Sequence, residues 1–180
     1  RLASGLLKLA ISENTQGLFR CEATFGNWDV SDNPTGFLYF DRRKLDFGKA
    51  FKIKLGTDRD VELLRTIRET TDRELRVDAN CGWTVKQALR MLPVLEEFGV
   101  TVLEQPLVPT DLEGLGIIRR AARIPLIADE SCRTAADIPP LVGQVDGINI
   151  KLAKCGSLRE AIRMIGIAHD QSCATVRNLQ

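Results

Sequence analysis

Charged residues that could do chemistry follow short apolar segments at regular intervals along the chain. Three are carboxylates and three are amines: Asp78, Glu104 and Asp129, with Lys52, Lys54 and Lys151. If the apolar segments are parallel strands, their carboxyl ends meet at one rim of the sheet. Three carboxylates brought together in a partly dry pocket repel one another unless positive charge lies among them.

A divalent cation would supply that charge. The candidate ligand atoms are all oxygens, with no histidine or thiolate nearby, and such a set selects a hard ion. An open site that keeps water for substrate exchange favours Mg²⁺ over Ca²⁺. We therefore predict that Asp78, Glu104 and Asp129 bind Mg²⁺. Ordinary salt bridges between these acids and the strand-end lysines are the alternative.

The lysines suggest acid/base chemistry. Lys52 and Lys54 are two residues apart, so in a strand their side chains point to the same face. Crowding of two ammonium groups and partial burial both lower a lysine pKa, toward a range useful for a general base. Lys151 closes a later strand and could approach the same substrate carbon from the opposite side. The alternatives are a solvated strand end for the pair and a salt bridge for Lys151.

The elements that must position these residues recur from residue 47 onward as strand, turn and amphipathic helix. The helix starts are marked by Ser or Thr followed three residues later by an acid or amide, a pattern typical of a capping box. These pairs are Thr57/Asp60, Thr84/Gln87, Thr110/Glu113, Thr134/Asp137 and Ser157/Glu160. The predicted strands are Ala50–Lys54, Leu75–Asp78, Val100–Glu104, Pro125–Asp129, Gly147–Lys151 and Cys173–Val176.

This alternation indicates an α/β fold with parallel pairing and right-handed crossovers. Its even interval favours a (β/α) TIM-type barrel over residues 47–180, incomplete, with about six or seven βα units. An open doubly wound sheet is the alternative, although no glycine-rich dinucleotide loop follows any predicted strand. Residues 1–46 do not share the pattern and form an unassigned N-terminal segment. Within it we expect a helix over Leu2–Ile11 and a strand over Gly36–Phe40.

The composition is that of an ordinary globular protein, with 44% hydrophobic and 27% charged residues. Lys plus Arg (25) nearly balances Asp plus Glu (24), so the basic surplus typical of nucleic-acid or anionic-membrane binding is missing. No apolar run has the length of a transmembrane helix, and the start lacks a signal-peptide pattern. The five cysteines lack CxxC pairing. We expect a cytoplasmic protein with reduced thiols and neither nucleic acid nor membrane as a partner.

Five motifs taken together resemble the muconate-lactonizing branch of the enolase superfamily. They are Lys52-Ile53-Lys54, Val77-Asp78-Ala79-Asn80, Glu104-Gln105-Pro106, Ala128-Asp129-Glu130-Ser131 and Asn149-Ile150-Lys151. The resemblance implies that the three acids bind Mg²⁺, that Lys54 and Lys151 are the acid/base pair, and that Lys52 tunes Lys54. It also implies abstraction of the proton α to a carboxylate, with the resulting enediolate held by the metal.

Within that branch, residues 78–83 and 146–156 are most similar to dipeptide epimerases of the L-Ala-D/L-Glu type. The expected protein is an isomerase that epimerises a small-molecule carboxylate, a dipeptide, and a homo-oligomeric state is compatible with it. Muconate cycloisomerase and o-succinylbenzoate synthase activities are alternatives. Members of the branch carry a capping domain and an eight-stranded barrel, and this chain departs from the pattern at both ends. An inactive barrel fragment that lacks the capping domain is therefore a further alternative.

Overall fold

The structure, a computed structural model, describes residues 8–13, 19–25, 50–171 and 174–178. In this part of the chain, eight strands form one sheet whose order follows the sequence. β1 and β2 pair antiparallel, and every later pair of neighbours is parallel. The strands are β1 (Lys8–Glu13), β2 (Phe19–Phe25), β3 (Ala50–Lys54), β4 (Glu74–Asp78), β5 (Val100–Glu104), β6 (Leu126–Ala128), β7 (Gly147–Lys151) and β8 (Ala174–Asn178).

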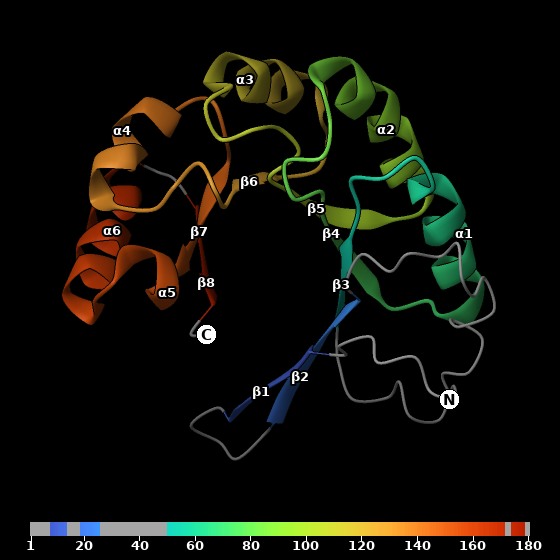
Figure 1. Cartoon of the computed structure of the whole chain (residues 1–180), viewed down its shortest axis with the longest axis horizontal. Coiled ribbons are helices and arrows are strands. Elements are labelled where there is room, and N and C mark those ends of the chain that lie inside the picture. Colours follow the sequence, from blue (N-terminus) through green and yellow to red (C-terminus); the bar gives the residue numbers. More distant parts are fainter. Residues whose placement is uncertain (1–7, 14–18, 26–49, 172–173, 179–180) are drawn as a thin grey trace.

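From β3 onward, helices connect the parallel strands and lie along the outer side of the curved sheet (Figure 1). They are α1 (Asp60–Thr70), α2 (Val85–Glu97), α3 (Leu112–Ala121), the short pair η2 (Ala135–Asp137) and α4 (Ile138–Leu141), then α5 (Leu152–Cys155) and α6 (Leu158–Asp170). A doubly wound sheet reverses its strand order and carries helices on both faces. The unbroken order and the single helical layer instead make an incomplete TIM-type barrel, as the sequence predicted.

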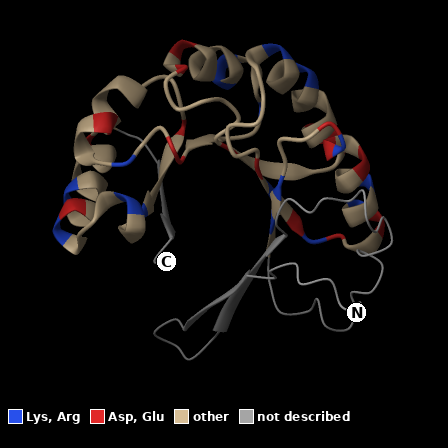
Figure 2. Cartoon of the chain, in the orientation of Figure 1, with Lys and Arg blue, Asp and Glu red and all other residues tan. Residues whose placement is uncertain are grey.

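The core lies between the strands and this outer layer of helices. In β3, Phe51 and Ile53 are buried toward the helices, whereas Lys52 and Lys54 alternate with them on the other face. Each long helix buries one stripe, for example Leu92 and Leu95 in α2. Figure 2 shows charges of both signs on the outer helices. The two-residue period of the strand is therefore what turns the lysines toward the inside of the barrel.

The predicted strands from residue 50 onward are confirmed, and the bounds of β4, β6 and β8 differ from the predicted ones by one or two residues. Three helix starts are confirmed, because Thr84, Thr134 and Ser157 are N-cap residues. The start predicted at Thr57 is wrong, since α1 begins at Asp60 after Arg59. The start predicted at Thr110 is wrong by one residue. There Asp111 is the cap, and its side chain accepts from the N–H of Gly114 at 2.9 Å.

The N-terminal segment contributes a hairpin to the same sheet. The helix predicted over Leu2–Ile11 is wrong for residues 8–11, which lie in β1 and pair with β2. Pairing with the next strand, β2, satisfies the backbone here, and the apolar spacing within residues 8–11 alone cannot reveal it. β2 continues the sheet through Thr24↔Lys52 and Phe25↔Ile53. The strand predicted over Gly36–Phe40 lies outside the described residues, and a domain boundary after residue 46 stays a prediction.

A buried carboxylate joins two loops at the rim where the strands end. Asp60 is 3% exposed and accepts from the backbone N–H groups of Gly56 at 3.0 Å and Thr57 at 2.9 Å. It also accepts from the indole Nε1 of Trp83, in the loop after β4, at 2.8 Å. The two loop backbones touch, because a Cβ at Gly82 would lie 2.5 Å from the Cα of Gly56. These contacts hold the rim of the sheet between β3 and β4.

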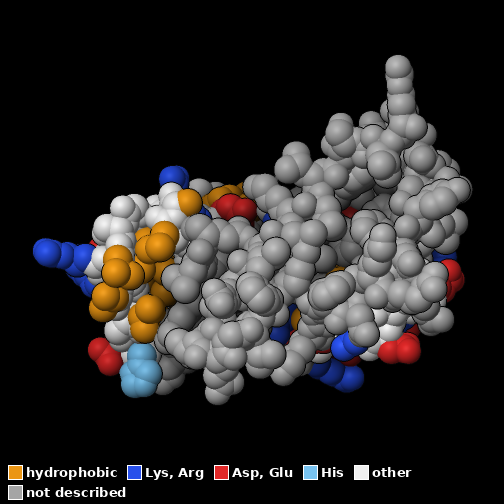
Figure 3. Space-filling model, turned by 90° about the horizontal axis from the view of Figure 1, so that it is seen from below, with side chains coloured by type: hydrophobic (Ala, Val, Ile, Leu, Met, Phe, Trp, Pro, Cys, Tyr) orange, Lys and Arg blue, Asp and Glu red, His pale blue; other side chains and the backbone are white. Residues whose placement is uncertain are grey.

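One side of α6 carries exposed apolar side chains. Leu158 and Ile162, one helical turn apart, are 64% and 61% exposed. Figure 3 shows apolar side chains gathered at the α5–α6 end of the molecule. No helix among the described residues has the length and apolar character needed to cross a membrane.

Replacing Asp60 by alanine should lower the free energy of unfolding by about 3 kcal/mol, because buried donors from two loops lose their common acceptor. Glu62→Ala is the matched control on the same helix, since the Glu62 side chain is 60% exposed. That control should change the free energy of unfolding by no more than about 0.5 kcal/mol. Urea unfolding measures both variants. Equal losses would contradict the assigned role of Asp60.

Candidate metal and acid/base site

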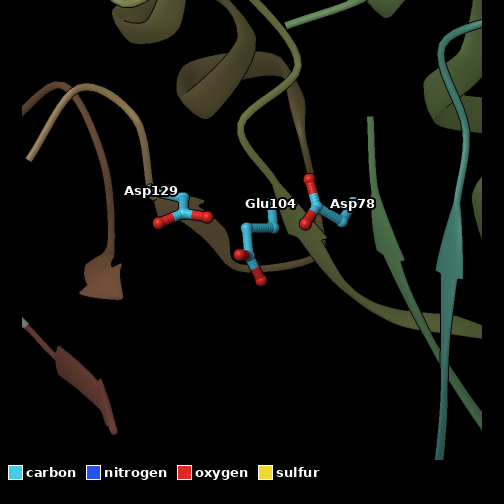
Figure 4. A group of neighbouring side chains, drawn as sticks. All are labelled: Asp78, Glu104 and Asp129. Carbon is cyan, nitrogen blue, oxygen red and sulfur yellow. The ribbon is translucent and has the colours of Figure 1, made fainter. Parts of the chain in front are cut away.

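Three buried carboxylates from three neighbouring strand ends converge at the inner rim. Asp78 ends β4, Glu104 ends β5, and Asp129 follows β6. Each offers one oxygen atom, and these atoms all lie within 4.8 Å of one another. Figure 4 shows the three side chains in a row with Glu104 in the middle. The structure thus brings together the three acids that the sequence singled out.

Two lysines from β3 neutralise one end of this row. The Nζ of Lys54 lies 2.5 Å from Oδ2 of Asp78. The Nζ of Lys52 lies 3.0 Å from the same oxygen and 2.6 Å from Oε2 of Glu104. Both side chains face the acids because they alternate with the buried residues of β3. The predicted common face of the two lysines is therefore observed.

Two further lysines, from the β7–α5 segment, neutralise the other end. Lys151 ends β7 and donates to Oδ2 of Asp129, whereas Lys154 donates to Oδ1 of the same carboxylate. Burial raises the pKa of Asp129, but the hydrogen bonds from both lysines outweigh this, and the net pKa lies below its usual value. Lys54 and Lys151 therefore contact opposite ends of the carboxylate row.

The remaining pKa values follow from burial and from the charges across the strands. Burial raises the pKa of Asp78, but the charges of Lys52 and Lys54 outweigh it and leave the pKa below its usual value. At Glu104, burial and the negative charge of Asp78 raise the pKa by more than Lys52 lowers it, so the net pKa lies above its usual value. Burial lowers the pKa of Lys52, but Glu104 and Asp78 more than compensate, so its net pKa is raised. The prediction of a lowered lysine pKa is therefore wrong for Lys52.

Buried amides fix the acids in place. Asn149 of β7 donates through Nδ2 to Oε1 of Glu104 at 2.8 Å. Gln105 is fully buried, with a positive φ of 34°. Its Oε1 accepts from the backbone N–H groups of Asp129 at 2.9 Å and Ser131 at 3.1 Å. A non-glycine residue held at positive φ is unusual. Here it lets one side chain join the ends of β5 and β6.

Sequence reasoning assigned no role to three of these residues, Gln105, Asn149 and Lys154. Gln105 directly follows Glu104, Asn149 lies two residues before Lys151, and Lys154 lies inside the quoted segment 146–156. Lys154 comes three residues after Lys151, in a helical turn that directly follows a strand. The spacing of Lys151 and Lys154 could have identified Lys154. A lysine one helical turn after a strand-end lysine returns to the same rim of the sheet.

The donor set fits a hard divalent cation. Only carboxylate oxygens make up the converging group in the part of the chain that the structure describes, and all three acids are buried. Oxygen ligands of this kind suit Mg²⁺. The salt bridges weighed as the alternative are present too, so the ion pairs alone do not identify a metal site. Three carboxylate oxygens from three strand ends within 4.8 Å of one another are the feature that ion pairing does not require.

Comparisons with known proteins agree with this geometry. A family model described as enolase C-terminal domain-like matches residues 40–177. An L-Ala-D/L-amino acid epimerase of Maribacter sp. is 45% identical over 115 residues, 64% of this chain and 34% of that protein. The L-Ala-D/L-Glu epimerase of Bacteroides thetaiotaomicron is 43% identical over 119 residues, 66% of this chain and 31% of that protein.

A solved structure is similar as well. It is the dipeptide epimerase of Enterococcus faecalis complexed with Mg and the dipeptide L-Leu-L-Tyr, with a TM-score of 0.71 and 38% identity. The match covers 76% of this chain and 40% of that one. The chain spans about a third of the length of the two curated relatives named above. Its family model match, covering most of the chain, places the protein in the enolase C-terminal domain-like family.

Proposed function

We propose that this protein contributes the proton-transfer site of a Mg²⁺-dependent dipeptide epimerase. The observation that carries the proposal is the row of three buried carboxylates with Lys54 at one end and Lys151 at the other. In this proposal Asp78, Glu104 and Asp129 hold Mg²⁺. A bound Mg²⁺ ion would supply positive charge that stabilises an enediolate formed from the substrate carboxylate.

In this proposal, Lys54 and Lys151 remove and return the proton. One amine, as the free base, removes the proton from the carbon α to the substrate carboxylate, and the electron pair of the C–H bond moves into the carboxylate. The ammonium group at the opposite end donates a proton to the other face of the same carbon. Configuration inverts, and the two lysines exchange protonation states. Placing amines at both ends of the row suits a reaction that must run in both directions.

Lys52 has a supporting role in the proposal. It contacts Asp78 and Glu104 together, at 3.0 and 2.6 Å, and lies two residues from Lys54 on the same face. Its charge disfavours a second proton-bearing amine beside it, which helps Lys54 to act as a base.

The substrate class rests on the relatives. The curated relatives are named as epimerases of L-Ala-D/L-amino acids and of L-Ala-D/L-Glu, and the solved relative holds Mg and a dipeptide. A small dipeptide whose C-terminal residue is epimerised next to its carboxylate fits the site chemistry. We therefore favour dipeptide epimerisation over muconate cycloisomerase or o-succinylbenzoate synthase activity.

A non-catalytic partial barrel that associates with other protein is a second candidate. Leu158 and Ile162 expose an apolar stripe on α6. Within the described strands, β1 and β8 each have an outer edge that no other strand covers. Unpaired edges promote association between chains. These features, rather than the site itself, favour this candidate.

Mg²⁺ should raise the melting temperature of the wild-type chain. A free Mg²⁺ concentration of about 100 times the dissociation constant adds about 2.7 kcal/mol to the free energy of unfolding. Asp129→Asn should abolish this stabilisation, because the row loses one anionic ligand. Asp58→Asn, at an exposed acid in the loop after β3, should retain it. Differential scanning fluorimetry with and without Mg²⁺ measures the shift, and an equal shift in both variants would exclude the proposed ligand.

Lys54→Met and Lys151→Met should each slow epimerisation of L-Ala-L-Glu by about 10³-fold, the contribution of a positioned general base. In ²H₂O each variant should still exchange the α proton of one epimer, and the two variants should act on opposite epimers. Proton NMR follows the exchange. Lys86→Met, at an exposed lysine of α2, should behave as the wild type does. Exchange of both epimers by either site variant would rule out the two-base assignment.

Under the second candidate, the chain should form larger species in sizing chromatography as its concentration rises, with no α-proton exchange. Ile162→Glu should reduce that association, because it places a charge in the exposed stripe. Leu89→Glu is the control on α2, where the side chain is 37% exposed. A monomer that exchanges the α proton would eliminate this candidate.

A further inference from the structure

Lys154 makes more contacts than charge compensation requires. It lies in α5, directly after β7, and its side chain is 18% exposed. Its ammonium group donates to Oδ1 of Asp129 and, at 2.6 Å, to the backbone carbonyl of the same residue. It also donates to the carbonyls of Cys132 at 3.1 Å and Asn149 at 3.0 Å. One nitrogen therefore connects the segment that follows β6, at Asp129 and Cys132, to Asn149 in the middle of β7.

The two lysines on Asp129 differ in how they are held. Lys151 contacts Oδ2 through a side-chain ion pair, which has to open before its amine can reach a substrate. Lys154 is anchored on three backbone carbonyls in addition to Oδ1. Backbone carbonyls do not titrate, and one of the three, that of Asn149, belongs to β7 itself. Lys154 is thus fixed by the frame of the barrel, and it fixes Asp129 in turn.

We propose that Lys154 is a positioning residue, which holds the Asp129 carboxylate in the orientation where the three acids converge on a divalent cation. The inference rests on the metal site of the proposed function. Loss of a side chain that orients a metal ligand from outside changes metal affinity about 10- to 100-fold. If Lys154 were only a counter-ion, its removal would have the opposite effect, because removing a positive charge near a cation strengthens cation binding.

Isothermal titration calorimetry of the chain with Mg²⁺ separates the two roles. Lys154→Met keeps most of the side-chain volume but has no donor, and it should weaken Mg²⁺ binding about 10-fold or more. Lys154→Arg keeps the charge, but the planar guanidinium group spreads its donors over three nitrogens. It cannot place one nitrogen among the four acceptors of Lys154, so this variant should weaken Mg²⁺ binding as well. Lys86→Met should bind Mg²⁺ as the wild type does. Circular dichroism checks that each variant is folded.

Weakened binding in both Lys154 variants, beside unchanged binding in Lys86→Met, supports the positioning role. Equal or tighter binding by Lys154→Met would overturn it. Wild-type binding by Lys154→Arg would also overturn it, and this variant keeps the buried charge if the methionine variant does not fold. A wild-type chain that binds no Mg²⁺ would overturn the metal site itself, and this inference with it.

Discussion

The burial of three carboxylates whose oxygens lie within 4.8 Å of one another is the constraint on which the rest of this structure depends. Like charges so close together are tolerated only where positive charge lies among them. Two lysines of β3 supply it at one end of the row, and two from the β7–α5 segment supply it at the other. All of these groups meet because parallel strands in sequential order end at the same rim. The hairpin β1–β2 and the outer helices matter for the site mainly because they hold those strand ends in register.

The same ion pairs stabilise the site and restrain its chemistry. Lys54 forms an ion pair with Asp78, and Lys151 forms one with Asp129, so in the proposed reaction either amine reaches the substrate only after its ion pair opens. Lys154 does not share this requirement, since backbone carbonyls hold it. In the proposed reaction, Lys54 and Lys151 have to leave their carboxylates to exchange protons with the substrate. Lys154 has to stay in place, because in the proposed metal site it orients a ligand.

The sequence was sufficient to predict the barrel strands from residue 50 onward and the position of the three acids at one rim. A charged residue directly after a short apolar segment is a local pattern, and it marks the end of a buried strand. The sequence was insufficient where a contact depends on another strand. The pKa of Lys52 was predicted from its neighbour Lys54 alone, whereas acids on β4 and β5 decide it. Asp60 looked like part of a capping box but is engaged by Trp83 from a different loop. The strand at residues 8–13 exists through its pairing with residues 19–25, which no local helix pattern reports.

An anomalous diffraction map of crystals grown with Mn²⁺ in place of Mg²⁺ would test directly whether the three acids hold a metal. If they do, the map should show one ion with an oxygen of Asp78, Glu104 and Asp129 each at about 2 Å, the distance expected for octahedral oxygen ligation. An ion bound elsewhere, with the lysine ammonium groups still on all three carboxylates, would contradict it.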